Sequence, residues 1–245
     1  MFFFYFAAQT GVPGSLLDPH HDCRTNVIGT LNMLEACRLA DVKRFVFASS
    51  NAPLGRQDPP AAEDKVALPI SPYGASKLAG EGYCLAYHGS WGLGTIVLRF
   101  ANLYGPHSAH KNSVVAKFFK DIWADGRIAI DGDGLQTRDF IYVADLCEAV
   151  RLALESDVSG EVFQIATGTE TSILQLATMV QQIAQRDVQM EHQPARQGDI
   201  QRNYSAVTKV EQMLGWKPET ELEDGLRQTW DWFAAQIAQA EPAVS

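Results

Sequence analysis

A serine that ends an apolar segment and a tyrosine–lysine pair four residues apart could together do redox chemistry on an alcohol. Ser50 ends the segment 44–50, and Tyr73 and Lys77 enclose the sequence Tyr-Gly-Ala-Ser-Lys. On a helix this offset places both side chains on one face. There the Lys77 ammonium can lower the pKa of the phenol, so that tyrosinate acts as a base, while Ser50 hydrogen-bonds the same substrate hydroxyl. Tyr-x-x-x-Lys alone also fits an ordinary amphipathic helix, so the surrounding elements decide its meaning.

The elements around these residues alternate between strand and helix patterns. Helical spacing runs over 26–40, an apolar strand over 44–48, a second helix over 72–88 and a second strand over 95–100. Strands separated by helices predict a parallel sheet. Ligands of such sheets bind beyond the carboxyl ends of the strands, which is where Asn102 falls, on the loop after the strand over 95–100.

Beyond residue 106 the alternation becomes less regular, which predicts a smaller C-terminal α/β lobe. Asp145 is expected to cap one helix, and Ser172-x-x-Gln175 is a capping-box signature for another. The remaining expected elements are helices over 114–124, 145–155, 172–186 and 222–237 and strands over 128–130 and 162–166. The expected division is a sheet domain over 1–110 and a lobe over 111–245, with some lobe strands returning to the main sheet.

Composition sets limits on the class of protein. The 245 residues are 46% hydrophobic with a net charge of −9, enough for a substantial core and unfavourable for nucleic-acid binding. The apolar run 1–6 is far shorter than the ~20 residues of a membrane span. The four cysteines lack Cys-x-x-Cys spacing, which is typical of reduced cytoplasmic thiols, and the six histidines lack supporting ligands for a metal.

Several short motifs follow one another along nearly the whole chain. They are Ala7-Ala-Gln, Asn26-x-x-Gly-Thr, Ala48-Ser-Ser, Ser71-Pro-Tyr-Gly-Ala-Ser-Lys, Leu98-Arg-Phe-Ala-Asn-Leu-Tyr-Gly-Pro, Gly132-Asp-Gly, Thr137-Arg-Asp-Phe and Leu214-Gly-Trp-x-Pro. Their order resembles the extended short-chain dehydrogenases/reductases, in particular the NAD-dependent nucleotide-sugar epimerases and dehydratases such as the UDP-glucose 4-epimerases. The resemblance implies a Rossmann-like fold.

The resemblance also implies site residues. Catalysis would fall to Ser50, Tyr73 and Lys77. The residues expected at the cofactor are Ala7, Ala8, Asn26, Ser49, Tyr73, Lys77 and Phe100. The residues expected at the substrate are Ser50, Asn102, Val114, Arg138, Arg196 and Asp199. Asn26 would also brace the catalytic helix, although capping a helix is its ordinary alternative.

One part of the family pattern is missing. No Gly-x-x-Gly-x-x-Gly turn for the pyrophosphate of NAD follows any expected strand. The run 1–6 resembles the fourth strand of the family, so we expect a truncated sheet lacking about 60 to 75 residues, judged from the ~30 residues of a βαβ unit. This would leave an apolar sheet edge that needs a partner.

Departures from the family pattern narrow the chemistry. The related 4,6-dehydratases carry an Asp-Glu pair after the catalytic serine or threonine, and uronate decarboxylases carry a glutamate there. Asn51 and Ala52 occupy these positions. Leu54 also replaces a common tyrosine. Elimination and decarboxylation are therefore disfavoured, and a UDP-sugar 4-epimerase acting through a transient 4-keto intermediate is expected.

Two alternatives stay open. An inactive remnant could bind a nucleotide sugar or a partner without catalysis, and an NADP-dependent keto-sugar reductase could use the same serine, tyrosine and lysine. The residue that separates NAD from NADP would lie in the missing segment, so NADP stays open beside NAD. Family members usually dimerise through the helices starting near Asn26 and Pro72, so a homodimer is expected.

Overall fold

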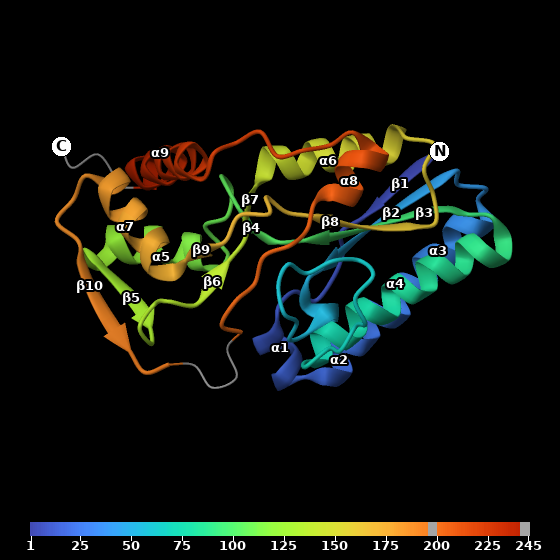
Figure 1. Ribbon diagram of the computed structural model, residues 1–245, viewed down its shortest axis with the longest axis horizontal. Coiled ribbons are helices and arrows are strands. Elements are labelled where there is room, and N and C mark those ends of the chain that lie inside the picture. The colour runs from blue at the N-terminus through green and yellow to red at the C-terminus, as the bar shows by residue number, and fades with distance from the viewer. Residues whose placement is uncertain (196–199, 241–245) are drawn as a thin grey trace.

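The centre of the molecule is a four-stranded parallel sheet. The computed structural model describes residues 1–195 and 200–240, with side chains as far as residue 236. The strand order is β1-β2-β3-β8. The strands are β1 (Phe2–Tyr5), β2 (Arg44–Ser50), β3 (Gly94–Phe100) and β8 (Glu161–Ile165). Because all four run in one direction, their carboxyl ends meet at one edge near the middle of the molecule (Figure 1).

Helices cover both faces of this sheet. α3 (Gly29–Leu39) and α4 (Pro72–Trp91) lie on one face, and α6 (Val143–Glu155) and α8 (Thr208–Leu214) lie on the other (Figure 1). The α4 face is packed around the rings of Phe45 and Phe47, and the α6 face around Phe163. Since β2 and β3 are buried on both faces, they read as nearly continuous apolar runs.

The helix α4 packs directly against β2. Ser71 caps it by accepting a hydrogen bond from the Gly74 amide, and Pro72 occupies its first turn. A Cβ placed on Gly80 would come within 2.5 Å of the Phe47 ring. The glycine therefore lets α4 rest directly on the strand that ends at Ser50.

The polypeptide between β1 and β2 forms one nearly continuous helical path. It consists of α1 (Val12–Leu17), α2 (Pro19–Cys23), a π-helical turn η1 (Arg24–Ile28) and α3. The helix expected over 26–40 therefore begins earlier. Asn26 lies inside the π-helical turn, so it does not act as an N-cap. Such turns are often found at functional sites.

The second half of the chain builds a smaller cluster of helices and short strands, at the left of Figure 1. A separate apolar core joins its helices, with Phe118, Phe119 and Ile122 fully buried. The helices are α5 (Val114–Asp125), α7 (Ile173–Ala184) and α9 (Leu222–Ala240). The strand pairs are β5 (Arg127–Asp131) with β10 (Gln189–Gln193), β4 (Asn102–Tyr104) with β7 (Phe140–Tyr142), and β6 (Thr137–Arg138) with β9 (Thr171–Ser172).

Two helix starts test the capping expectations. The Ser172–Gln175 capping box is present, with both reciprocal hydrogen bonds. The expectation that Asp145 caps its helix is wrong, because Tyr142 occupies the cap position. The Asp145 carboxylate instead accepts hydrogen bonds from the amide and hydroxyl of Thr220, which ties α6 to the segment before α9.

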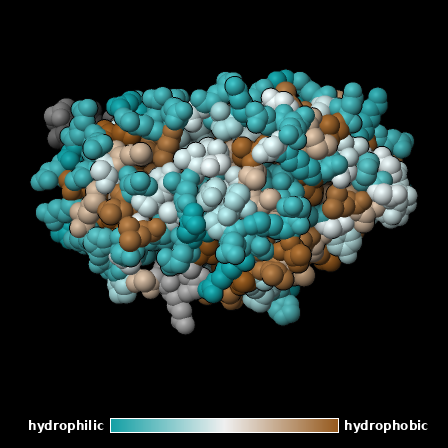
Figure 2. Space-filling view, in the orientation of Figure 1, coloured by the Kyte–Doolittle hydropathy of each residue, from teal (hydrophilic) through white to brown (hydrophobic). Residues whose placement is uncertain are grey.

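Apolar surface is uneven over the molecule. Hydrophobic residues gather along the lower edge of the face in Figure 2, over α1 and the start of α4. Leu16 and Leu17 of α1 and Leu68 before α4 are exposed. Among the described residues β1 is an edge strand and Phe2 is 59% exposed, as the expected apolar edge requires. Within the same residues, no helix is both long and apolar enough to cross a membrane.

Candidate active site

Ser50, Tyr73 and Lys77 come together at the carboxyl end of β2. The Lys77 ammonium donates to the carbonyl oxygen of Ala48 at 3.0 Å and lies 6.0 Å from the centroid of the Tyr73 ring. The Tyr73 hydroxyl is hydrogen-bonded to the Ser50 side chain. Lys77 is only 5% exposed, whereas Tyr73 is half-buried and reaches the surface. The three groups therefore form a hydroxyl pair with a buried cation behind it.

Burial governs the protonation of this group. Desolvation lowers the pKa of Lys77 to about 8, against the opposing charges of Asp22 and Glu81. Desolvation also raises the pKa of Tyr73, and the hydrogen bond with Ser50 only partly offsets it. The expectation that Lys77 holds the phenol pKa low is therefore not met in this structure. The physical reason is the loss of water around the Tyr73 phenol, to which the negative charge of Asp22 adds.

Asn26 joins the helical path after β1 to the catalytic helix. Its side-chain oxygen accepts from the Gln9 amide at 2.8 Å, and its side-chain nitrogen donates to the Ser76 hydroxyl at 3.0 Å. Ser76 lies on α4 between Tyr73 and Lys77. The predicted bracing of the catalytic helix by Asn26 is thus confirmed, and its predicted contact with a cofactor stays a prediction.

A buried carboxylate behind Asn26 escaped the sequence analysis. Asp22 is 1% exposed, and its Oδ1 accepts from the Asn26 side-chain nitrogen at 3.0 Å. Its charge favours the protonated form of Lys77. The signal in the sequence was the four-residue spacing of Asp22 and Asn26, which places both on one face of a helix.

A second buried carboxylate fixes α4 to the sheet. Glu81 is 2% exposed and accepts two hydrogen bonds from Arg99 of β3, at 2.9 and 2.7 Å. It also accepts from the hydroxyl of Ser49. The Ser49 side chain therefore bonds to α4, and its predicted contact with a cofactor stays a prediction. The four-residue spacing of Lys77 and Glu81 was the signal that could have identified Glu81.

The residues predicted at the cofactor follow β1 and β3. Ala7 is exposed and Ala8 half-buried, just beyond the carboxyl end of β1. The rings of Phe6 and Phe100 lie 6.3 Å apart, so the ends of β1 and β3 approach each other across the sheet edge. The side-chain oxygen of Gln9 in the same loop is buried without a hydrogen-bond partner.

The residues predicted at the substrate lie on the other side of the sheet edge. Asn102 begins β4, and both its backbone and side-chain nitrogens donate to the carbonyl oxygen of Asp139, at 2.9 and 3.1 Å. Arg138 donates to the carbonyl oxygen of Ile200 at 2.7 Å. Val114 is the half-buried first residue of α5 and packs against the core of the smaller helical cluster. Arg196 and Asp199 lie outside the described residues.

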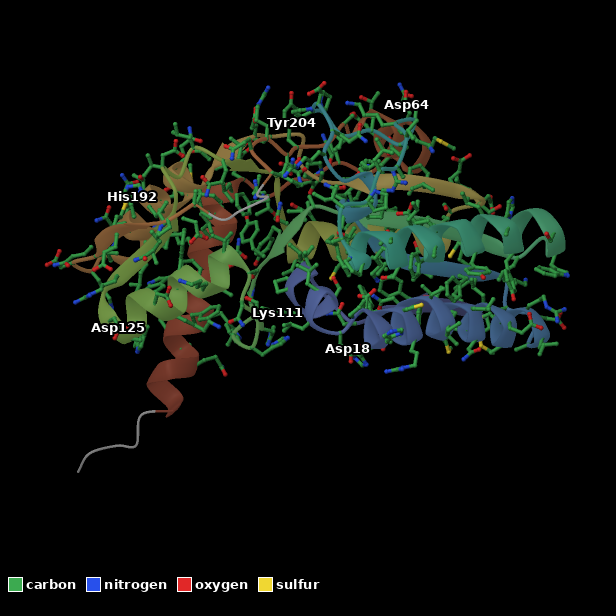
Figure 3. All side chains as sticks on the ribbon, turned by 90° about the horizontal axis from the view of Figure 1, so that it is seen from below. Asp18, Asp64, Lys111, Asp125, His192 and Tyr204 are labelled. Carbon is green, nitrogen blue, oxygen red and sulfur yellow. The ribbon has the colours of Figure 1, made fainter. Side chains whose placement is uncertain are left out.

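The segment after residue 200 returns to the loop that follows Ser50. Ala61 donates its amide to the carbonyl oxygen of Tyr204, and the carbonyl oxygen of Ala61 accepts from the Ala206 amide, each at 2.8 Å. Tyr204 and Asp64 mark these neighbouring segments at the upper edge of Figure 3. A hollow between the segments is lined in part by Asn51 and Leu54. The catalytic and substrate sides are thereby joined.

The site contains no metal cluster within the described ranges. No group of three or more His, Cys, Asp or Glu side chains in residues 1–195 and 200–236 could hold an ion. The polar groups that converge are hydroxyls, one ammonium, carboxylates, an amide and a guanidinium. Such a set can exchange a proton with a hydroxyl and bind an anion.

Comparisons with known proteins agree with this geometry. The model of the NAD dependent epimerase/dehydratase family matches residues 2–166. UDP-glucose 4-epimerase of Mycolicibacterium smegmatis is 36% identical over 234 residues, covering 94% of this chain and 75% of the relative. The chain therefore belongs to the NAD-dependent epimerase/dehydratase family. Its matched relatives also include dTDP-glucose 4,6-dehydratases.

Solved structures share the fold. UDP-glucose 4-epimerase of Thermotoga maritima, determined with UDP-glucose, aligns with a TM-score of 0.91 at 36% identity, covering 96% of this chain and 78% of that one. UDP-glucuronic acid 4-epimerase of Bacillus cereus, determined with UDP-glucuronic acid and NAD, aligns with a TM-score of 0.88 at 29% identity, covering 96% and 76%. The expected α/β, Rossmann-like architecture is confirmed.

Proposed function

We propose that this protein is a UDP-sugar 4-epimerase that works with NAD through a transient 4-keto sugar. The observation that carries the proposal is the convergence of Ser50, Tyr73 and Lys77 at the sheet edge that faces Asn102 and Arg138. One side of that edge can exchange a proton with a sugar hydroxyl, and the other carries a guanidinium suited to a diphosphate. The UDP-sugars in the two solved relatives support this substrate class.

Each catalytic residue has a distinct part in the reaction. Tyr73 removes the proton from the 4-hydroxyl of the sugar, and Ser50 orients that hydroxyl and passes the proton. Lys77 stabilises the tyrosinate by its charge. The 4-keto sugar then rotates in the site, so that its opposite face is reduced. Tyr73 returns the proton to the C4 oxygen, and the product has the opposite configuration at C4. Asn26 and Glu81 hold α4 so that these groups stay in register.

The residues present fit the nicotinamide-ribose end of the cofactor. Among the described residues the Lys77 ammonium donates one hydrogen bond, to Ala48, which leaves two of its three donors for ribose hydroxyls. The buried Gln9 side-chain oxygen without a partner offers an acceptor beside Ala7 and Ala8. When bound there, NAD supplies reversible hydride transfer at the sugar C4. NADP stays open.

The residues after Ser50 favour epimerisation over elimination. The side-chain nitrogen of Asn51 donates to the Ser205 hydroxyl at 3.0 Å, and Ala52 has no acid–base group. Loss of water from a 4-keto sugar needs a general acid and a general base beside the sugar. Neither position supplies one, so the relationship to 4,6-dehydratases does not extend to their chemistry.

On the substrate side, Asn102, Val114, Arg138, Arg196 and Asp199 are proposed to bind the nucleotide diphosphate. The division into a cofactor domain over 1–110 and a substrate lobe over 111–245 is part of the same proposal. The separate apolar core of the smaller cluster supports it. α6, α8 and β8 come from the second part of the chain but pack on or join the main sheet. This supports the expectation that some elements after residue 110 return to that sheet.

We also propose a homodimer formed through α3 and α4. Leu39 of α3 is 70% exposed, and Leu85 and Trp91 of α4 are 39% and 56% exposed, so these helices present apolar side chains outward. Light scattering after gel filtration should give twice the chain mass. Leu85→Glu should give the monomer, and a monomeric parent protein would contradict the proposal.

The experiment for the proposed function measures both the bound cofactor and the conversion of a UDP-sugar. The purified protein is denatured, the supernatant is assayed for NAD(H) and NADP(H), and the native protein is incubated with UDP-glucose and added NAD. The proposal expects UDP-galactose and an NAD requirement. UDP-glucose binding without product would favour the inactive alternative, and net consumption of NADPH with a 4-keto sugar would favour the reductase.

A further inference from the structure

Asp139 connects the parts of the substrate side, although the sequence analysis assigned only its neighbour Arg138 in the Thr137-Arg-Asp-Phe motif to binding. It lies between β6 and β7 with 0% exposure. Its Oδ1 accepts from the amide and the hydroxyl of Thr167, both at 2.8 Å, and its Oδ2 accepts from the amides of Gly168 at 2.9 Å and Ser205 at 3.3 Å. The carboxylate therefore joins the loop after β8 to the segment that follows residue 200.

The backbone of Asp139 adds a third connection. Its carbonyl oxygen accepts both hydrogen bonds from Asn102, so the side-chain nitrogen of that residue is held by Asp139. Asn102 lies just beyond the end of β3, whose last residue, Phe100, is paired with Ser50 on the neighbouring strand. One residue thus links the ends of β3 and β8 with the returning segment.

Arg138 is held in the same place. It precedes Asp139 in the chain and donates to the carbonyl oxygen of Ile200, while the Thr137 amide donates to the carbonyl oxygen of Gln201 at 2.8 Å. These bonds tie the same returning segment to β6. A change in the position of Asp139 would therefore move Arg138, Asn102 and the segment after residue 200 together.

The chemistry of the four side-chain bonds favours a carboxylate. All four partners donate, and a carboxylate has only acceptors, so each donor is satisfied. An asparagine of the same shape would turn an amide nitrogen toward at least one amide N–H and leave that donor unpaired. Buried donors left unpaired are costly, so the surrounding segments would have to shift.

We propose that Asp139 is a positioning residue for the nucleotide-diphosphate half of the site. It sets Asn102, Arg138 and the segment after residue 200 relative to one another, and it does not itself touch the ligand. This inference rests on the proposed UDP-sugar function. It assigns to Asp139 an effect on nucleotide affinity, separate from the chemistry at Tyr73.

A matched control exists in the same chain. Asp145 is also buried, at 8% exposure, and accepts from the amide and the hydroxyl of a threonine, Thr220. Its bonds tie α6 to the segment before α9, and they involve neither Asn102 nor Arg138. Asp145→Asn therefore reproduces the loss of a buried acceptor with no expected effect on the nucleotide.

The test is titration calorimetry with UDP on the 245-residue chain and on both variants. We expect Asp139→Asn to weaken UDP binding about tenfold or more, which corresponds to the loss of one or two charge-assisted hydrogen bonds. Asp145→Asn should leave UDP binding within about twofold of the parent protein. With a UDP-sugar substrate, Asp139→Asn should raise KM and leave kcat within about threefold.

A milder variant covers the case in which Asp139→Asn does not fold. Thr167→Val removes one of the four donors and should weaken UDP binding roughly two- to fivefold. UDP binding unchanged in Thr167→Val and in a folded Asp139→Asn, or weakened equally by Asp145→Asn, would overturn the inference. A parent protein that does not bind UDP would overturn the proposed function, and the inference with it.

Discussion

The two sides of the active site are built in different ways. On the catalytic side, Ser50 ends a buried strand, and Tyr73 and Lys77 lie one helical turn apart on the same face of α4. On the substrate side, Asn102 and Arg138 lie on short strands and are held by bonds to Asp139 and Ile200. The first side is a strand and a helix packed together, and the second is a set of loops and short strands joined by hydrogen bonds.

This difference shows which interactions hold the side chains of each side in position. The catalytic side is fixed by packing and by buried ion pairing, because Gly80 lets α4 rest on Phe47 and Glu81 pairs with Arg99. The substrate side depends on backbone amides from distant segments that converge on Asp139. We therefore expect changes on the first side to affect turnover or folding and changes on the second to affect nucleotide affinity.

The largest effect should come from Tyr73→Phe, which removes the proton acceptor and leaves the ring. Turnover should fall by about 10³-fold, within the range typical of a lost general base. UDP affinity should stay within about twofold, because the residues proposed to bind the nucleotide do not include Tyr73. Steady-state kinetics and UDP calorimetry measure the two quantities, and Tyr83→Phe on the outer face of α4 is the matched control. Turnover unchanged in Tyr73→Phe would contradict the assignment.

The next effect is on stability and tests how α4 is held. Glu81→Gln leaves the Arg99 guanidinium buried without its counter-charge, which should lower the free energy of unfolding by about 3–5 kcal/mol. Chemical denaturation measures it. Glu223→Gln breaks the exposed Glu223–Arg227 pair and should leave the unfolding midpoint nearly unchanged. Equal effects of the two variants would contradict the role assigned to the buried Glu81–Arg99 pair in holding α4 on the sheet.

Arg138→Met tests the substrate side directly. It keeps the aliphatic part of the side chain and removes the charge, so UDP binding should weaken about 10- to 100-fold for a lost charge-assisted contact. The affinity for UMP should fall less, because UMP carries one phosphate group. Calorimetry with both nucleotides gives the comparison. If the variant lowered kcat and left UDP affinity intact, Arg138 would belong to the catalytic side.

The smallest effect concerns the charge of Lys77. Its pKa is lowered to about 8 by burial, and the facing charges of Asp22 and Glu81 act in the opposite direction. Activity that needs the ammonium should therefore fall as the pH rises through about 8. Asp22→Asn removes one stabilising charge, so Lys77 loses its proton at lower pH and the alkaline limb of kcat should move down. At pH 8 this should appear as a roughly few-fold loss of kcat.

A control on the same helical path separates charge from structure. Asp18→Asn changes an exposed carboxylate before α2 that accepts from the His21 amide. Because this carboxylate lies in water at the surface, its charge is screened from the buried Lys77. Its alkaline limb should match that of the parent protein. An alkaline limb that stays in place, or moves up, in Asp22→Asn would contradict the assigned role of Asp22.

The catalytic side could be predicted because its signal is local. Tyr73 and Lys77 are four residues apart, and the strand before Ser50 is a continuous apolar run. Local spacing and strand patterns also placed the main helices and the parallel sheet. Asp22 and Glu81 were missed although each lies four residues from a recognised partner, because a buried acid reads as an ordinary polar position until its neighbours are known.

The substrate side could not be assembled from spacing. The partners of Asp139 come from residues 102, 167, 168 and 205. No local pattern links them, so only the family resemblance suggested Asn102 and Arg138. The raised pKa of Tyr73 could not be predicted either, because proximity to a cation can be inferred from spacing whereas the loss of water around the phenol cannot.

The most direct test of the central claim follows the hydrogen at C4. The protein is incubated with NAD and UDP-glucose deuterated at C4, and the products are analysed by NMR and mass spectrometry. A 4-epimerase acting through a 4-keto sugar should give UDP-galactose that keeps deuterium at C4, with no net reduction of NAD. A product that has exchanged this deuterium for solvent hydrogen, or unchanged UDP-glucose in a protein that binds both ligands, would contradict the account.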